Sequence, residues 1–223
     1  VDIVTANDSS VNAKIGGDLA GFTADIEFDV SDTAASIAAE VAASGSGASS
    51  LDEANSVVVE SGAAVTASQA ESIQDIVGYS GAASDYDITD SASNLISAGD
   101  EVLNVTGVDI VTANDTSVNA NIGAQLNAFT ADIEFDVVDN AAGLIAEMGG
   151  ADVAGHLTEA NSITVDNGAG SSVVNASDGA ILAGFTADVA FDVADDVGDL
   201  KSVMGSDDPA SYLTEANSIT VDD

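Results

Sequence analysis

Short stretches of alternating apolar and polar residues recur along the chain. The stretch FTADIEFDV at 22–30 returns unchanged at 129–137 and as FTADVAFDV at 185–193. Period-two alternation predicts strands with one apolar face and one polar face. In the first copy the apolar residues are Ala24, Ile26, Phe28 and Val30, and the acidic residues are Asp25, Glu27 and Asp29.

Nine stretches in all carry a strand pattern of this kind. They cover residues 1–6, 24–30, 55–60, 85–89, 102–112, 131–137, 161–166, 187–193 and 217–222. Helical patterns lie between them. Val11, Ile15, Leu19 and Phe22 fall on one predicted helical face.

Helix start signals follow several of the predicted strands. Asp32, Asp90, Asp139 and Asp195 stand where N-caps belong, just before Ala- and Leu-containing turns. Ser68 with Glu71 matches a capping box. The pattern therefore predicts strands that alternate with short helices.

The chain is internally repeated. Residues 1–40 align with 108–147 without a gap, and 29 of the 40 positions are identical. The element LDEANSVVV at 51–59 returns as LTEANSITV at 157–165 and at 213–221. These spacings predict four repeat units, at 1–60, 61–107 (diverged), 108–167 and 168–223.

Strands joined through short helices at regular spacing imply parallel strands with right-handed crossovers. We therefore predict an α/β repeat solenoid with one parallel sheet, short helices on one side and an open face on the other. The alternatives are a β-solenoid with few helices and a doubly wound α/β domain, which would need helices on both faces of the sheet.

The amino-acid composition restricts the kinds of molecule that the chain can bind. The chain has 39 acidic residues, two Lys and no Arg, and its formal net charge is -37. This charge excludes nucleic acid as a partner and disfavours anionic membranes. No apolar run has the length of a membrane span, so no membrane insertion is expected. An acidic surface also fits a high-salt habitat.

Nothing in the sequence predicts an enzyme. There is no Cys, and the one histidine, His156, aligns with Tyr212 in an otherwise matching segment. Nucleophilic triads and phosphate clamps therefore lack their residues. Acidic residues occur in every repeat, whereas an active site is usually a single place. We predict no catalytic residues and no required cofactor.

Calcium is the most specific ligand hypothesis for the acidic residues, because clusters of oxygen ligands suit Ca²⁺. Parallel strands would stack equivalent carboxylates from different repeats, and a tight local group stands at 84–90. The candidate metal ligands are Asp25, Glu27, Asp29, Asp132, Glu134, Asp136, Asp85, Asp87 and Asp90. The alternative is diffuse screening of the charge by cations.

Two segments, FDVSDTAASIAAEV at 28–41 and YDITDSASNLISAGDEVLNVTG at 86–107, combine a strand that ends in Asp with a small-residue helix. This pattern resembles the tandem repeats of large secreted bacterial surface proteins of the adhesin, S-layer and matrix type. The resemblance implies export to the cell surface or medium, and a role in surface layers, adhesion or filaments.

These observations lead to two functional hypotheses. The first is a structural extracellular protein whose repeats stack head to tail into a filament, surface layer or matrix, because the strand edges of a solenoid pair unless they are capped. The second is an adhesin stalk whose acidic open face binds a glycan, a mineral or a cationic surface. Residue 1 is not Met and stands inside a repeat, so we expect a processed subunit or a segment of a longer array.

Overall fold

The computed structural model describes residues 4–5, 9–23, 26–44, 49–148, 157–185, 187–205 and 215–222. These residues form nine α-helices and several small parallel sheets, with no closed barrel among them. The predicted mixed α/β class is confirmed, and the helices disfavour a β-solenoid with few helices. The chain divides into two compact units, Val1–Asn114 and Asp115–Asp223.

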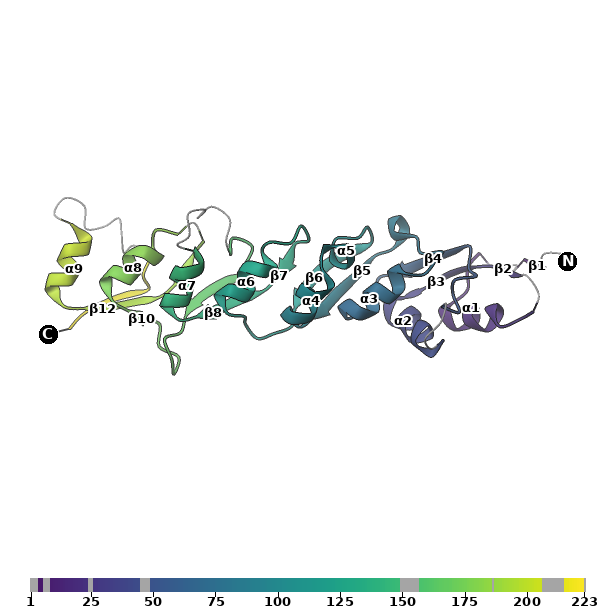
Figure 1. Cartoon of the computed structure of the whole chain (residues 1–223), viewed down its shortest axis with the longest axis horizontal. Helices are drawn as coiled ribbons and strands as arrows, with labels where there is room; N and C mark the ends of the chain where they lie inside the picture. The colour runs from purple at the N-terminus through teal and green to yellow at the C-terminus, as the bar shows by residue number, and fades with distance from the viewer. Residues whose placement is uncertain are drawn as a thin grey trace. The chain divides into compact units, whose positions relative to one another are not determined.

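In the first unit, helices alternate with single strands or pairs of strands, except that α5 follows α4 directly (Figure 1). Its elements are β1 (Val4–Thr5), α1 (Ala13–Ala20), β2 (Ile26–Glu27), β3 (Asp29–Thr33), α2 (Ala34–Ala43), β4 (Ser56–Glu60), α3 (Ala67–Gln74), the 3₁₀ turn η1 (Gly81–Ala83), β5 (Tyr86–Asp90), α4 (Ala92–Ala98), α5 (Asp100–Leu103) and β6 (Val108–Ala113).

The second unit has the same alternation. Its elements are α6 (Ala120–Leu126), β7 (Ile133–Glu134), β8 (Asp136–Asp139), α7 (Ala141–Met148), β9 (Ser162–Val165), β10 (Val173–Val174), α8 (Ala176–Leu182), β11 (Val189–Ala190), β12 (Asp192–Asp195), α9 (Val197–Met204) and β13 (Ser218–Val221).

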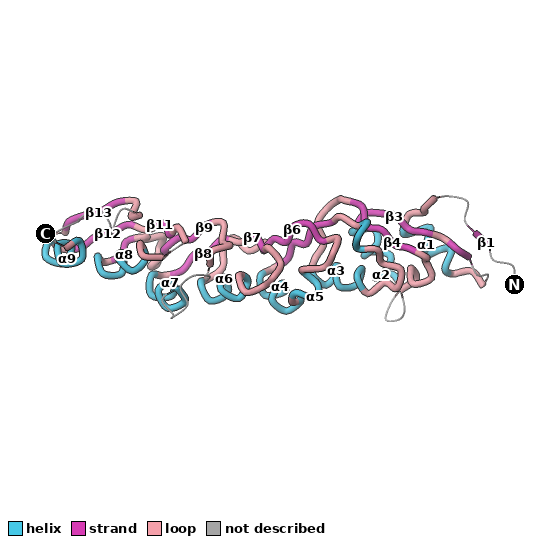
Figure 2. The backbone as a smooth tube through the Cα atoms, turned by 90° about the horizontal axis from the view of Figure 1, so that it is seen from above, coloured by secondary structure: helices cyan, strands magenta, loops and turns pink. Residues whose placement is uncertain are grey.

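Within each unit, neighbouring strands pair in parallel. In the first unit β1 pairs with β2, β3 with β4, and β5 with β6. In the second unit β9 lies between β8 and β11, and β12 lies between β10 and β13. Figure 2 shows α3 and α4 of the first unit, and α7 and α8 of the second, on one side of their strands.

The alternation along the strands is confirmed. Phe28, Phe135 and Phe191 are buried, as are the Val residues two positions later in each copy. Glu27 and Asp29 are exposed. Each predicted FTAD strand is split at its Phe, whose carbonyl accepts a backbone bond from the Asn of the repeated EAN element, as in Asn55 N to Phe28 O at 2.9 Å.

Other strand boundaries differ from the prediction. Residues 102–103 belong to α5, so the predicted strand 102–112 begins at Val108. The two-residue strand β10 was not predicted. Both differences lie where a helix turn or a loop joins two strands and period-two alternation is weakest.

The predicted apolar face of the first helix is wrong. Ile15 is 46% exposed and Phe22 is 62% exposed, whereas Ala13 and Gly16 are buried. Small residues let the helix approach the strands closely: a Cβ atom built at Gly16 would lie 2.8 Å from Val30 Cγ2. Equivalent contacts surround Gly123 of α6, where a Cβ would lie 2.8 Å from Leu157 Cδ2 and 2.9 Å from Val137 Cγ2.

Candidate functional site

Hydroxyl groups face carboxylates across the open side of the strands. Ser31 on β3 donates to Glu60 on β4 at 2.6 Å, and Ser162 on β9 donates to Asp136 on β8. The register explains this, because Asp136 stands directly opposite Ser162. Each such carboxylate has a hydrogen-bond donor on the adjacent strand, which offsets part of its desolvation.

Asp192 on β12 accepts from two serines, Ser172 on one side and Ser218 on the other. Hydrogen bonds to the ionised form stabilise that form. The bond from Ser172, followed by the bond from Ser218, lowers the pKa of Asp192 below its ordinary value. The Asp192 carboxylate is therefore held from both sides by serine hydroxyl groups.

Within each unit, Glu27, Asp29 and Asp136 lie opposite hydroxyl residues, and the stacking of equivalent carboxylates from the two units stays a prediction. Asp29 on β3 faces Ser56 on β4, and Asp136 faces Ser162, because strands of the FTADIEFDV type lie beside strands of the NSITV type. Glu27 on β2 faces Thr5 on β1. Asp25 lies outside the described residues.

One predicted metal ligand lies close to an acid that the sequence did not single out. Glu159, in the turn before β9, has its pKa raised by burial and then by the charge of Asp132. Two carboxylates that face each other disfavour a second charge. Glu134, from the same predicted set, is exposed on β7.

The aspartates predicted as N-caps have a different role. Asp32, Asp90, Asp139 and Asp195 each stand one residue before the actual cap, at the end of a strand. In each of them, one carboxylate oxygen accepts a hydrogen bond from the backbone N–H of the next residue. The other oxygen accepts from the first backbone N–H of the preceding helix. In chain order, these donors are Ala13, Ala67, Ala120 and Ala176. We call these four residues the strand-end aspartates.

Each strand-end aspartate thus joins the N-termini of two consecutive helices. A carboxylate at this place satisfies amides that have no partner within their helix, and its charge suits the positive end of the helix dipole. The predicted capping box at Ser68 and Glu71 is also displaced: the structure forms it with Thr66 and Gln69. Asn167 occupies a comparable place in the second unit and accepts from Ala141 N at 3.0 Å.

The predicted local cluster at 84–90 is divided. Asp85 is exposed before β5, and Asp87 accepts from Ile110 N at 3.3 Å. Asp90 is 8% exposed and accepts from Ala67 N, Ser91 N and the Asn94 side chain. Its oxygens therefore serve two helix ends.

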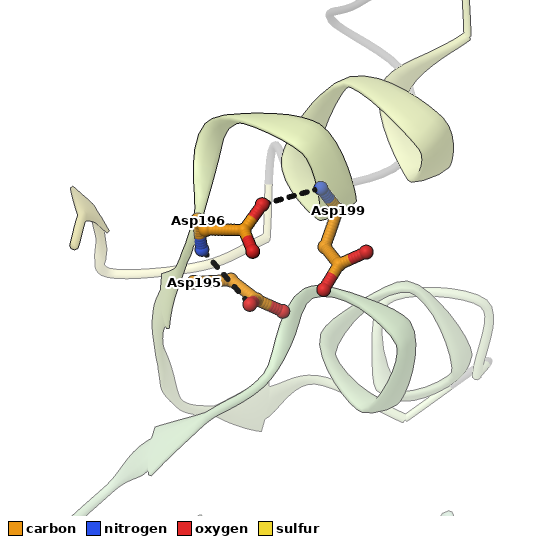
Figure 3. A group of neighbouring side chains, drawn as sticks. All are labelled: Asp195, Asp196 and Asp199. Atoms are coloured by element: carbon orange, nitrogen blue, oxygen red, sulfur yellow. Dashed lines mark hydrogen bonds between the residues drawn. The ribbon is translucent and has the colours of Figure 1, made fainter. Parts of the chain in front are cut away.

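Among the described residues, one group of acids brings potential metal-ligand atoms within 4.8 Å of one another: Asp195, Asp196 and Asp199. Figure 3 shows the three carboxylates around the first turn of α9. Asp195 Oδ1 accepts from Asp196 N, and Asp196 Oδ1 accepts from Asp199 N at 3.0 Å, so helix capping explains part of the arrangement. In the sequence, this acidic group corresponds to the run Asp-Asp-x-x-Asp at 195–199, which could have indicated it.

The residues that could serve general catalysis are dispersed. Lys14 forms a salt bridge with Asp18 at 2.9 Å on the surface of α1, and Lys201 is exposed on α9. The hydrogen bond to Asp18, followed by its charge, raises the pKa of Lys14. His156 lies outside the described residues. The absence of catalytic residues remains a prediction.

Comparison with known proteins gives no family. No family model matches the chain, and no curated protein or solved structure matches it. In the described part of the chain, no helix has both the length and the apolar character that crossing a membrane requires.

Proposed function

We propose that the chain is a structural repeat protein that acts outside the cell, where its units build a filament, surface layer or matrix by end-to-end stacking. The proposal includes a solenoid arrangement of the four repeat units. It is supported by the internal duplication, the parallel pairing in both units and the recurrence of the strand-end aspartates.

The observation that carries the proposal is a comparison of two strands with the same sequence. Strands β9 and β13 both read Ser-Ile-Thr-Val. In β9, which lies between two strands, Ile163 is 3% exposed and Val165 is 1% exposed. In β13, which pairs only with β12 among the described strands, Ile219 is 44% exposed and Val221 is 52% exposed.

The same two side chains are therefore covered in β9, which has a paired strand on each side, and exposed in β13 among the described residues. Exposed edge strands with apolar side chains pair with other strands unless something covers them. The surface of β13 has the chemistry to accept another repeat of this kind, and a structural protein built by stacking would use it.

Electron microscopy of the purified chain at raised ionic strength tests this function. The net charge of -37 opposes association, and the Debye length falls from about 10 Å at 0.1 M salt to about 3 Å at 1 M. We expect rows of stacked units as salt increases. Discrete monomers at every salt and protein concentration would contradict the proposal.

A second candidate function is binding through the acidic open face. Carboxylates of this face accept from neighbouring hydroxyl groups, as Asp192 does from Ser172 and from Ser218 on β13. Carboxylates that are pre-organised in this way within each unit suit a mineral or a cationic surface, and repetition adds avidity. Retention on a calcium mineral by the native chain, and its loss in an Asp29→Asn, Asp136→Asn, Asp192→Asn variant, would favour this function.

A further inference from the structure

The only Asn–Gly pair of the sequence, Asn167–Gly168, lies in the loop that follows β9. A glycine leaves the backbone nitrogen beside it unshielded, because it has no Cβ atom. Such a nitrogen can attack Cγ of the preceding asparagine and close a succinimide ring. Gly168 is exposed, and a Cβ atom built on it would have nothing within 4 Å. The fold therefore leaves room around the nitrogen that would attack.

A carboxylate faces the proton that must leave this nitrogen. Asp166 Oδ1 accepts from Gly168 N at 2.8 Å and from Gly170 N at 3.1 Å. A general base must lie within hydrogen-bond reach of the proton that it removes, and the bond to Gly168 N meets this condition. Asp166 is half-buried, and its backbone N–H donates to Asp139 O at 2.8 Å. The base is therefore anchored to the neighbouring strand at the start of the loop.

The side-chain amide of Asn167 is bound at both of its polar atoms. Its Oδ1 accepts from Ala141 N, the first amide of α7, at 3.0 Å. Its Nδ2 donates to Val173 O at 2.7 Å. Attack at Cγ places negative charge on Oδ1, and a backbone N–H that already points at this oxygen stabilises that charge. The Val173 carbonyl faces the nitrogen that must leave.

Another asparagine of the same unit shows that partners of this kind are not sufficient. Asn119 Oδ1 accepts from Ile122 N at 3.0 Å, and the next amide, Ala120 N, donates to the Asp139 carboxylate at 3.0 Å. Ala120 is fully buried and begins α6, so its nitrogen cannot turn toward Cγ of Asn119. Asn119 therefore provides a control within the same chain.

We infer that Asn167 deamidates in the folded chain, with Asp166 as the general base and the Ala141 amide as the donor to the oxyanion. Asp166 takes the proton of Gly168 N as the bond from this nitrogen to Cγ forms. The Cγ–Nδ2 bond then breaks, and Nδ2 leaves as ammonia with that proton. Water next adds to Cγ, the ring nitrogen recovers a proton as its bond to Cγ breaks, and an aspartate stands at position 167.

The product has the group that the other repeats use at this place. Each strand-end aspartate accepts from the first amide of the preceding helix, as Asp139 does from Ala120 N. An aspartate at position 167 would accept from Ala141 N in the same way, and its charge suits the N-terminus of α7. Water that added to the backbone carbonyl of the succinimide would give isoaspartate instead, and the Ala141 amide favours Cγ by polarising its oxygen. The conversion needs no second chain, so it does not depend on stacking.

Peptide mass spectrometry of the full chain, aged at mildly alkaline pH with and without urea, tests the reaction. Fragmentation that separates aspartate from isoaspartate gives the rate of each conversion at position 167. We expect conversion several-fold faster in the folded chain than in the unfolded chain, with aspartate as the main product. Asn119 should remain unchanged in the folded chain. A folded rate equal to or below the unfolded rate would overturn the inference.

Two variants test the base. Asp166→Asn keeps an oxygen that can accept from the loop amides but removes the base, so its folded rate should fall to the unfolded rate or below. Asp136→Asn removes the same charge from β8 of the same unit and should leave the rate unchanged. An undiminished rate in Asp166→Asn, with a native circular dichroism spectrum, would overturn the role of Asp166. Isoaspartate as the main product would overturn the role of the Ala141 amide. If Asp166→Asn does not fold, the comparison of the folded and unfolded native chain still decides.

Discussion

Asp90 offers the clearest perturbation of the link between consecutive repeats. It is the most buried strand-end aspartate, and it accepts three bonds: from Ala67 N at 3.1 Å, Ser91 N at 2.8 Å and Asn94 Nδ2 at 2.8 Å. Replacing Asp90 with Ala leaves the amides at the start of α3 and α4 without this acceptor in a site that water reaches poorly.

The expected loss of stability follows from these bonds. A hydrogen bond contributes about 1 kcal/mol net, and buried donors that lose their partner add a desolvation cost. We therefore expect Asp90→Ala to lower the free energy of unfolding by about 3 kcal/mol. Asp90→Asn should cost less, because Asn keeps one acceptor oxygen, as Asn167 shows at its own position.

Urea denaturation followed by circular dichroism measures the effect, and amide hydrogen exchange at Ala67 and Ser91 locates it. The matched control is Asp109→Ala, which removes an exposed carboxylate from β6 and should change stability by less than about 0.5 kcal/mol. If Asp90→Ala were as stable as Asp109→Ala, the strand-end aspartates would not stabilise the chain by joining the N-termini of consecutive helices.

Three further predictions concern packing, ionisation and metal. Gly16→Ala should destabilise the first unit by about 1 kcal/mol, since overpacking against Val30 outweighs the gain in helix propensity, whereas Gly21→Ala, whose nearest contact is 3.4 Å, should be neutral in the same urea titration. The folded pKa of Asp192 is depressed, so its contribution to stability is present above the unfolded pKa and is lost as pH falls through the folded pKa. NMR titration of a Ser172→Ala, Ser218→Ala variant should show the pKa of Asp192 returning toward 3.8, and an unchanged pKa would refute the role of the serines. Specific calcium sites predict that calcium raises the melting midpoint more than magnesium at equal concentration, and equal shifts would indicate screening alone.

The sequence predicted the strands well where period-two alternation was long. Phe28, Val30 and their copies are buried as expected, because alternate side chains of a strand point to opposite faces of the sheet. It predicted the helix faces poorly. Ile15 and Phe22 are large and apolar, yet they are exposed. The buried face of α1 contains Ala13 and Gly16, because a helix that lies close to the strands has room only for small residues.

The caps and the acidic face depended on contacts that local patterns do not contain. Both Asp32 and Thr33 suit an N-cap, and the structure assigns the cap to Thr33, which accepts from Ser36 N, while Asp32 accepts from Ala13 N, 19 residues away. The residue that stands opposite each acid within a unit also required the fold: Ser56 stands opposite Asp29 because two kinds of strand alternate. The run of aspartates at 195–199 was readable from the sequence, but the proximity of Glu159 to Asp132 required the fold.

Sedimentation velocity of the native chain and of an Ile219→Asp, Val221→Asp variant at high salt tests whether β13 mediates stacking. Val77→Asp serves as the control, because Val77 is 81% exposed in a turn outside β13. Stacking through β13 predicts large species for the native chain and the control, and monomers for the double variant with an unchanged melting midpoint. Equal assembly by all three proteins would contradict the account.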